Sequence, residues 1–128
     1  MIDVMNDSLD RLYASVAAAR ERDPSTSRTA KLFRDGVQKM AKKLIEESIE
    51  AGLDAVQGKR EATILESADM LYHLAVLWAG CGITPAEVVG EIERRERIYG
   101  IAEKLSKEAR EAQARRMAGA GARRSAAG

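Results

Sequence analysis

The chain has 128 residues, of which 45% are hydrophobic and 32% are charged, and its formal net charge is +1. This length predicts one domain with a single modest core, and the balanced charge argues against nucleic acid or an anionic membrane as a partner. A single cysteine, Cys81, excludes an intramolecular disulfide and favours a reducing, cytoplasmic setting. No basic segment followed by an apolar one opens the sequence, and no apolar run is long enough to span a bilayer, so we expect neither a signal peptide nor a membrane span.

Residues 6–22 predict an amphipathic helix, because apolar residues recur there at helical spacing. The segment DPST at 23–26 ends this helix, since proline and the residue before it both resist the helical conformation. Residues 27–36 predict a loop or a short turn of helix that ends at Gly36.

Two long helices are predicted next, at 37–57 and 60–79, with Gly58 suited to the end of the first. A connection this short makes consecutive helices antiparallel neighbours. Side chains that the two helices turn toward each other can therefore meet, although they lie far apart in the sequence.

A fourth helix is predicted from the segment TPAE, which begins at Thr84, to about Tyr99. Thr84 suits the N-cap and Pro85 suits the first helical position. Glu87, three residues after the threonine, completes a capping box.

No segment predicts a strand, so the expected fold class is all-α, with four to five helices in an antiparallel bundle. We expect one helical domain at 1–107. Residues 108–128 are rich in alanine, arginine and glycine and have no apolar stripe, which predicts a mostly disordered tail.

The helix at 60–79 contains the segment ESADMLYHLAVLW, which is apolar around most of its circumference. Glu66, Asp69 and His73 share one narrow polar sector, because spacings of three and four residues place them along one line of a helix. A helix that is apolar on most sides must be packed on most sides. We therefore expect a homo-oligomer, most simply a dimer, in which a second copy covers the remaining apolar face and completes the bundle.

Four carboxylates are predicted to converge between the two antiparallel helices. Glu47 and Glu50 are spaced i and i+3, and Glu66 and Asp69 repeat this spacing on the next helix. Facing carboxylates repel one another unless a cation lies among them, and hard divalent cations prefer such oxygen ligands. Mg²⁺ is the expected cofactor, because it is usually held by a few carboxylates together with waters and substrate phosphates.

The lysines and glutamates of the helix at 37–57 also have a simpler interpretation, as solvated ion pairs spaced i and i+4. The second acidic pair, embedded in an apolar helix, favours the metal site. His73 stays open between a hydrogen-bonded core or interface residue and a catalytic base. Four nearby basic residues could grip phosphate groups or could be plain surface charge: Arg28, Lys31, Lys39 and Lys43.

The pattern EExxE at 46–50, fifteen residues, and then ExxD at 66–69 resembles the all-α nucleoside triphosphate pyrophosphohydrolases, the MazG-like superfamily. The resemblance sharpens to the phosphoribosyl-ATP pyrophosphohydrolases over about 8–105. The segments that carry it are DPSTSRTAKL, KMAKKLIEESIE, ESADMLYHLAVLW and GITPAEVVGEIERR. Two residues depart from the family pattern: Ile45 stands where glycine is common, and Arg28, which could add a phosphate contact, stands where an aromatic residue is common.

The resemblance implies a cytoplasmic, oligomeric, Mg²⁺-dependent enzyme that hydrolyses phosphoribosyl-ATP to phosphoribosyl-AMP and pyrophosphate, the second step of histidine biosynthesis. The four carboxylates would hold Mg²⁺. Glu46 and Glu47 are the candidate catalytic residues, with Glu46 either an outer-shell ligand or the base that activates water. Substrate contacts are expected from the four basic residues named above and from His73.

Two other functions stay open from the sequence. A housecleaning pyrophosphatase for other nucleoside triphosphates would use the same chemistry on a different substrate. A non-enzymatic helical adaptor would instead use the apolar helix purely as an interface, with its acidic residues paired to lysine or arginine across it.

Overall fold

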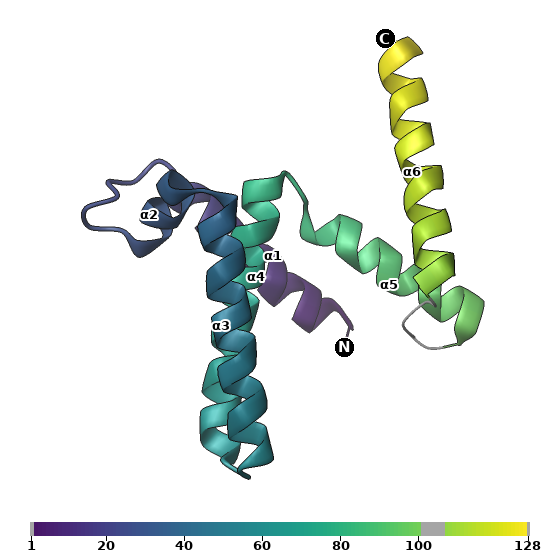
Figure 1. Cartoon of the computed structure of the whole chain (residues 1–128). Coiled ribbons are helices and arrows are strands. Elements are labelled where there is room, and N and C mark those ends of the chain that lie inside the picture. The colour runs from purple at the N-terminus through teal and green to yellow at the C-terminus, as the bar shows by residue number, and fades with distance from the viewer. Residues whose placement is uncertain (1, 101–106, 128) are drawn as a thin grey trace. The chain divides into compact units, whose positions relative to one another are not determined.

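The computed structural model describes residues 2–100 and 107–127, and throughout these ranges its regular secondary structure is helical, which confirms the all-α class. Figure 1 shows the six helices: α1 (Ile2–Ala19), α2 (Arg28–Asp35), α3 (Val37–Val56), α4 (Arg60–Cys81), α5 (Pro85–Tyr99) and α6 (Lys107–Ala127). The chain divides into two compact units, Met1–Gly90 and Glu91–Gly128. No single helix of the described ranges is long and apolar enough to cross a membrane, and only the sharply bent pair of α4 and α5 passes by length and composition.

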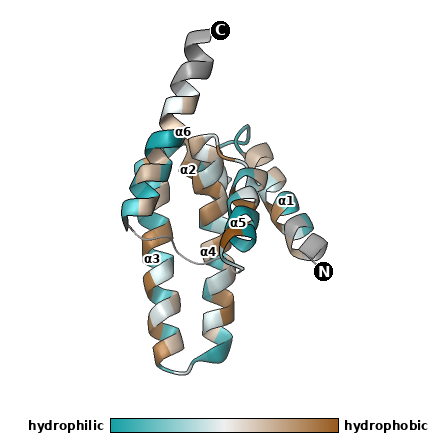
Figure 2. Cartoon of the chain, turned by 90° about the vertical axis from the view of Figure 1, so that its right-hand side faces the viewer, coloured by the Kyte–Doolittle hydropathy of each residue, from teal (hydrophilic) through white to brown (hydrophobic). Residues whose placement is uncertain are grey.

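Helices α3 and α4 form an antiparallel hairpin that makes the most extensive helix–helix contact among the described residues (Figures 1 and 2). Both lie within two residues of their predicted bounds. The connection turns at Gly58, whose φ of +72° lies in the left-handed region that glycine adopts without strain. The Lys59 amide donates a hydrogen bond to the Asp54 carbonyl at 2.9 Å, which satisfies one of the last carbonyls of α3. The turn sets the register in which the acidic residues of the two helices face each other.

The buried core lies at the end of the hairpin away from this turn. Helices α1, α2, α3 and α4 each contribute to it, and its members are Val16, Leu32, Met40, Ala75, Val76 and Ala79. The two long helices approach closely here, because a Cβ atom added at Gly80 would lie 2.5 Å from Met40 Sδ. Since Met40 is only 1% exposed, it has little room to move aside.

Helix α2 occupies the segment for which the sequence left a loop or a short helix open. Ser27 caps its N-terminus by accepting a hydrogen bond from the Ala30 amide at 3.1 Å. At its C-terminus, Gly36 has a φ of +97° and its amide donates to the Leu32 carbonyl at 3.0 Å. These two caps hold a helix of only eight residues against α3 and α4.

The capping box predicted at the start of α5 is confirmed. The Glu87 amide donates to Thr84 Oγ1 at 3.3 Å, and the Thr84 amide donates to Glu87 Oε1 at 3.1 Å. Pro85 is the first residue of the helix, where its missing amide hydrogen costs nothing.

Large apolar side chains remain exposed along the hairpin within one chain, and Figure 2 shows hydrophobic segments along both helices. On α3 they recur at helical spacing and are between 56% and 86% exposed: Ile45, Ile49, Leu53 and Val56. On α4 they include Ile64 and Leu65, which are 49% and 67% exposed. The sequence predicted that α4 is packed on most sides, but one chain does not cover it, so closure of a bundle by a second copy stays a prediction.

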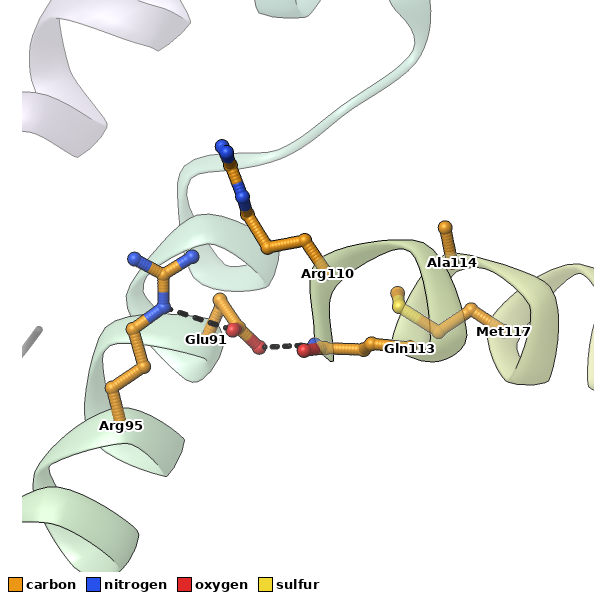
Figure 3. A pocket seen from close by; sticks show the side chains of 6 residues that line it. All are labelled: Glu91, Arg95, Arg110, Gln113, Ala114 and Met117. Atoms are coloured by element: carbon orange, nitrogen blue, oxygen red, sulfur yellow. Dashed lines mark hydrogen bonds and ion pairs between the residues drawn. The ribbon is translucent and has the colours of Figure 1, made fainter. Parts of the chain in front are cut away.

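The carboxyl-terminal unit differs from the prediction of a mostly disordered tail, because Lys107–Ala127 is helix α6. Alanine, arginine, glutamate and lysine all have high helix propensity, and this local preference explains a helix that lacks an apolar stripe. Figure 3 shows how the helix is tied to α5: Glu91 accepts hydrogen bonds from Arg95 at 3.0 Å and from Gln113 at 3.1 Å. Arg94 completes this group: its Nη2 atom donates hydrogen bonds to Glu91 Oε1 at 2.9 Å and to Gln113 Oε1 at 2.8 Å.

Candidate metal and phosphate site

The hairpin brings together carboxylates that are about twenty residues apart in the sequence. Glu47 of α3 and Glu66 and Asp69 of α4 each offer an oxygen atom, and the three oxygens lie within 4.8 Å of one another. Glu47 and Glu66 are half-buried, whereas Asp69 is exposed. Three of the four predicted ligands therefore form one group, which we call the carboxylate group.

The fourth predicted ligand, Glu50, is an exposed residue of α3 outside the carboxylate group, but it lies near enough to influence it. The pKa of Glu66 is raised from its ordinary 4.5 to about 7. The largest cause is a hydrogen bond that the protonated Glu66 carboxyl can donate to Glu47, followed by burial and then by the charges of Glu50, Glu47 and Asp69. A metal-free site thus holds a proton on Glu66 near neutral pH.

The donor set fits a hard divalent cation. All of the converging atoms are carboxylate oxygens, which are the ligands of Mg²⁺ and Ca²⁺ in proteins. Glu66 Oε2 is buried and has no hydrogen-bond partner in the described part of the chain, so this residue of the group carries an unsatisfied oxygen atom. A cation among the three carboxylates would relieve the repulsion that raises the pKa of Glu66.

Glu46 does not belong to the carboxylate group. Its Oε2 atom lies 3.5 Å from Lys43 Nζ, one turn back on α3, and both side chains are partly exposed. This contact is a surface ion pair of the kind that the simpler interpretation of the acidic helix predicted, although with a spacing of three residues instead of four. A catalytic role for Glu46 stays a prediction.

His73 lies one helical turn beyond Asp69 and is 1% exposed. Its Nε2 atom is 3.2 Å from Arg28 Nη2, and because a guanidinium has only donors, the imidazole nitrogen accepts. Burial lowers the pKa of His73, and the neighbouring charge of Arg28 lowers it further, so the ring is held neutral. The structure thus joins two of the predicted substrate-binding residues, one from α2 and one from α4.

Two residues that the sequence did not single out complete this contact. The hydroxyls of Thr29 and Tyr72 are hydrogen-bonded to each other, which ties the first turn of α2 to α4. The Tyr72 and His73 rings pack edge-on, with their centroids 4.9 Å apart. The guanidinium carbon of Arg28 lies over the Tyr72 ring, 5.8 Å from its centroid. The signal in the sequence was that Thr29 and Tyr72 lie within DPSTSRTAKL and ESADMLYHLAVLW, two of the segments that carry the family resemblance.

The two remaining predicted phosphate contacts, Lys31 of α2 and Lys39 of α3, form no ion pair with another described residue. Lys31 is exposed and Lys39 is half-buried. Their roles stay predictions.

Comparison with known proteins places this site in a family. The family model for phosphoribosyl-ATP pyrophosphohydrolase matches residues 9–96, which include the carboxylate group and the Arg28–His73 contact. The chain belongs to the phosphoribosyl-ATP pyrophosphohydrolase family. The resemblance identified from the sequence is confirmed, and the matched region ends before α6.

Relatives in the phosphoribosyl-ATP pyrophosphohydrolase family extend over most of the chain. It is 63% identical over 103 residues to phosphoribosyl-ATP pyrophosphatase 2 of Rhodopseudomonas palustris, covering 80% of this chain and 79% of that protein. It is 59% identical over 105 residues to the protein of the same name from Bradyrhizobium diazoefficiens, covering 82% and 78%. With phosphoribosyl-ATP pyrophosphatase of Azospirillum brasilense it shares 53% identity over 96 residues, covering 75% and 86%.

Proposed function

We propose that the chain hydrolyses phosphoribosyl-ATP to phosphoribosyl-AMP and pyrophosphate, the second step of histidine biosynthesis, in the cytoplasm. The observation that carries this proposal is the family match over residues 9–96 around three converging carboxylates. A cluster of acidic residues that repel one another is poorly suited to stability and well suited to holding a cation beside a polyphosphate.

We infer that Mg²⁺ is held by Glu47, Glu66 and Asp69, with Glu50 adding negative charge or a fourth ligand. A bound divalent ion neutralises the phosphate oxygens and the charge that develops on the leaving pyrophosphate. The chain's own contribution is the fixed spacing of the carboxylates, which the Gly58 turn and the packing of α3 against α4 impose. Glu66 must give up its proton when the cation binds, because its pKa is about 7 in the metal-free site.

The attacking water needs a base or an acceptor that orients it. Glu46 and Glu47 are adjacent acidic residues on α3, and Glu47 belongs to the carboxylate group. Glu47 reaches the carboxylate group directly. Glu46 forms an ion pair with Lys43, and its carboxylate oxygens can accept a hydrogen bond from water. We assign activation of water to this pair of residues.

We assign the substrate phosphates to the predicted basic side chains of α2 and α3, with His73 as a neighbour on α4. Arg28 has the firmest structural support, because its guanidinium is held in place and forms no ion pair with a described carboxylate. Lys31, Lys39 and Lys43 would add positive charge around the same substrate.

We propose further that the working form is a homodimer. The exposed apolar stripe of α3, from Ile45 to Val56, and the exposed residues Ile64 and Leu65 of α4 form a surface that a second copy can cover. Burial of these side chains would stabilise the hairpin that carries the carboxylate group.

The test is pyrophosphate release by the purified protein, with phosphoribosyl-ATP run beside ATP, dUTP and dCTP, each with Mg²⁺ and with EDTA. The proposal predicts turnover of phosphoribosyl-ATP alone and its loss with EDTA. Turnover of the simple triphosphates instead would indicate a housecleaning pyrophosphatase. No pyrophosphate release from any of the four substrates, by a protein shown to be folded, would favour the helical adaptor.

A further inference from the structure

Arg28 presents a positive charge that is fixed in place but not neutralised. Its side chain is exposed at the start of α2, and its observed partners are the Nε2 atom of His73 and the face of Tyr72. No carboxylate of the described residues forms an ion pair with it. A guanidinium has five N–H donors, and the one hydrogen bond recorded for Arg28 among the described residues uses only one of them.

The residue that holds Arg28 in place, His73, is a buried histidine whose second ring nitrogen has no partner among the described residues. His73 is 1% exposed, and because Nε2 accepts from Arg28, the proton of the neutral ring lies on Nδ1. His73 Nδ1 is buried without a hydrogen-bond partner among the described residues. A buried donor without a partner destabilises the fold, and core packing alone would favour an apolar side chain here. The histidine is therefore better explained by what it holds than by what it packs against.

Arg28 is also separate from the carboxylate group while remaining close to it. His73 follows Asp69 by one helical turn, and the charges of Asp69 and Glu47 both act on its imidazole. A triphosphate bound through a cation at the carboxylates would have its charge neutralised there. A phosphate elsewhere on the substrate needs its own cationic partner, and a guanidinium binds phosphate with two parallel hydrogen bonds.

We propose that His73 and Tyr72 hold Arg28 as the receptor for the phosphate on the substrate's phosphoribosyl group. Arg28 is then a specificity-determining residue, and His73 is a positioning residue that acts through it. This assignment rests on the proposed function, since phosphoribosyl-ATP differs from ATP by this second, phosphate-bearing ribose. Its central consequence is that Arg28 contributes to the binding of phosphoribosyl-ATP and not to the binding of ATP.

The test compares Arg28→Gln with Arg34→Gln, a matched control on the same helix whose exposed side chain pairs with Asp35. For each protein we would measure kcat and KM with phosphoribosyl-ATP, kcat/KM with an analogue that lacks the ribosyl 5′-phosphate, and inhibition by ATP. We expect Arg28→Gln to lower kcat/KM for phosphoribosyl-ATP roughly 10- to 100-fold, mainly through KM. The analogue's kcat/KM and the inhibition constant of ATP should stay within about twofold, and Arg34→Gln should change none of them.

A double-mutant cycle tests whether His73 acts through Arg28. His73→Phe should reproduce the selective rise in KM in the wild-type background and add almost nothing to Arg28→Gln. His73→Gln places an acceptor oxygen near the position of Nε2, so it should restore most of the preference even if the phenylalanine variant folds poorly. A histidine that served only the core would change the melting temperature without this selective change in KM.

Three results would overturn the assignment. Equal losses on phosphoribosyl-ATP and on the analogue would place Arg28 on the triphosphate, and a full additional loss from His73→Phe in the Arg28→Gln background would give His73 a role of its own. No effect of Arg28→Gln would make it plain surface charge. If the wild-type protein turned over no phosphoribosyl-ATP, the proposed function itself would fail, which is distinct from turnover with an unselective loss.

Discussion

Two glutamates of this chain, Glu66 on α4 and Glu91 on α5, have opposite electrostatic surroundings. The pKa of Glu66 is raised to about 7, because its neighbours are carboxylates that share a proton with it and repel its charge. The pKa of Glu91 is lowered to about 2, because Arg94, Arg95 and Gln113 all donate hydrogen bonds to it. A glutamate side chain is thus surrounded by hydrogen-bond donors at position 91 and by other carboxylates at position 66. Carboxylates that repel one another without a cationic partner indicate a ligand site, whereas a carboxylate with several hydrogen-bond donors indicates a structural role.

The largest difference between the two glutamates should appear in activity. Glu66→Gln and Asp69→Asn remove ligands from the carboxylate group, and we expect each to lower Mg²⁺-dependent kcat by about 1,000-fold or more. Glu91→Gln should leave kcat within about twofold, since Glu91 belongs to the satisfied network of the other unit. Pyrophosphate release from phosphoribosyl-ATP measures all three, and near wild-type turnover in either carboxylate variant would remove the metal assignment.

The second difference should appear in the response to metal. Mg²⁺ binds only the folded site, so saturating ion should raise the melting temperature of the wild-type protein by several degrees, corresponding to about 2.7 kcal/mol at a hundred times Kd. Glu91→Gln should show the same shift, while Glu66→Gln and Asp69→Asn should lose most of it. Thermal melts with EDTA and with graded Mg²⁺ give the comparison. An unchanged shift in Asp69→Asn would place the ion elsewhere.

The third difference is in how the stability of the metal-free protein depends on pH. Glu66 has a folded pKa of about 7 against an ordinary 4.5, so the folded state binds the extra proton, and its stabilising contribution is lost as pH rises from 4.5 through 7. Glu91 behaves oppositely: with a folded pKa of about 2, its contribution is present above 4.5 and is lost as pH falls toward 2.

Urea denaturation in EDTA at pH 5 and pH 8 tests this sign. The wild-type protein should lose stability between these two values, and Glu66→Gln should remove most of that loss because it cannot ionise. Glu91→Gln should retain the loss and differ from wild type equally at both pH values. The raised pKa of Glu66 would be contradicted if the wild-type protein gained stability from pH 5 to pH 8 and Glu66→Gln abolished that gain.

The smallest effect should come from removing α6, which contributes only Gln113 to the hydrogen-bonded group around Glu91. A chain that ends at Gly100 keeps the whole matched region and loses α6. We expect its kcat and KM for phosphoribosyl-ATP to stay within about twofold and its melting temperature within about 5 °C of the full chain, since the truncation removes the Gln113 hydrogen bonds and keeps the ion pairs within α5. A tenfold loss of activity would show that α6 serves the site.

The parts of the fold that could be predicted from the sequence are those fixed by local rules. The bounds of α3 and α4, the turn at Gly58 and the capping box of Thr84 and Glu87 all follow from periodicity and from residue types at helix ends. Helix α6 was missed because a segment without an apolar stripe was judged by packing, whereas alanine, arginine and glutamate, which make up most of it, favour a helix in spite of Gly119 and Gly121.

The site divides in the same way. Glu47, Glu66 and Asp69 could be brought together from the sequence, because one short turn fixes the register of two helices. The contact between Arg28 and His73 joins residues 45 positions apart through the docking of α2, and nothing in the spacing of the sequence encodes that docking. Its discovery needed the three-dimensional structure.

The most direct test of the carboxylate group as a metal site is a crystal structure of the protein grown with Mn²⁺, which substitutes for Mg²⁺ and has a measurable anomalous signal. If these carboxylates bind the ion, an anomalous peak lies among the side-chain oxygens of Glu47, Glu66 and Asp69, at the hairpin face where those oxygens converge. Asp69→Asn crystals should then show this peak weakened or absent. A wild-type structure with no peak there, or with lysine or arginine side chains from a second copy filling the group, would contradict the metal site.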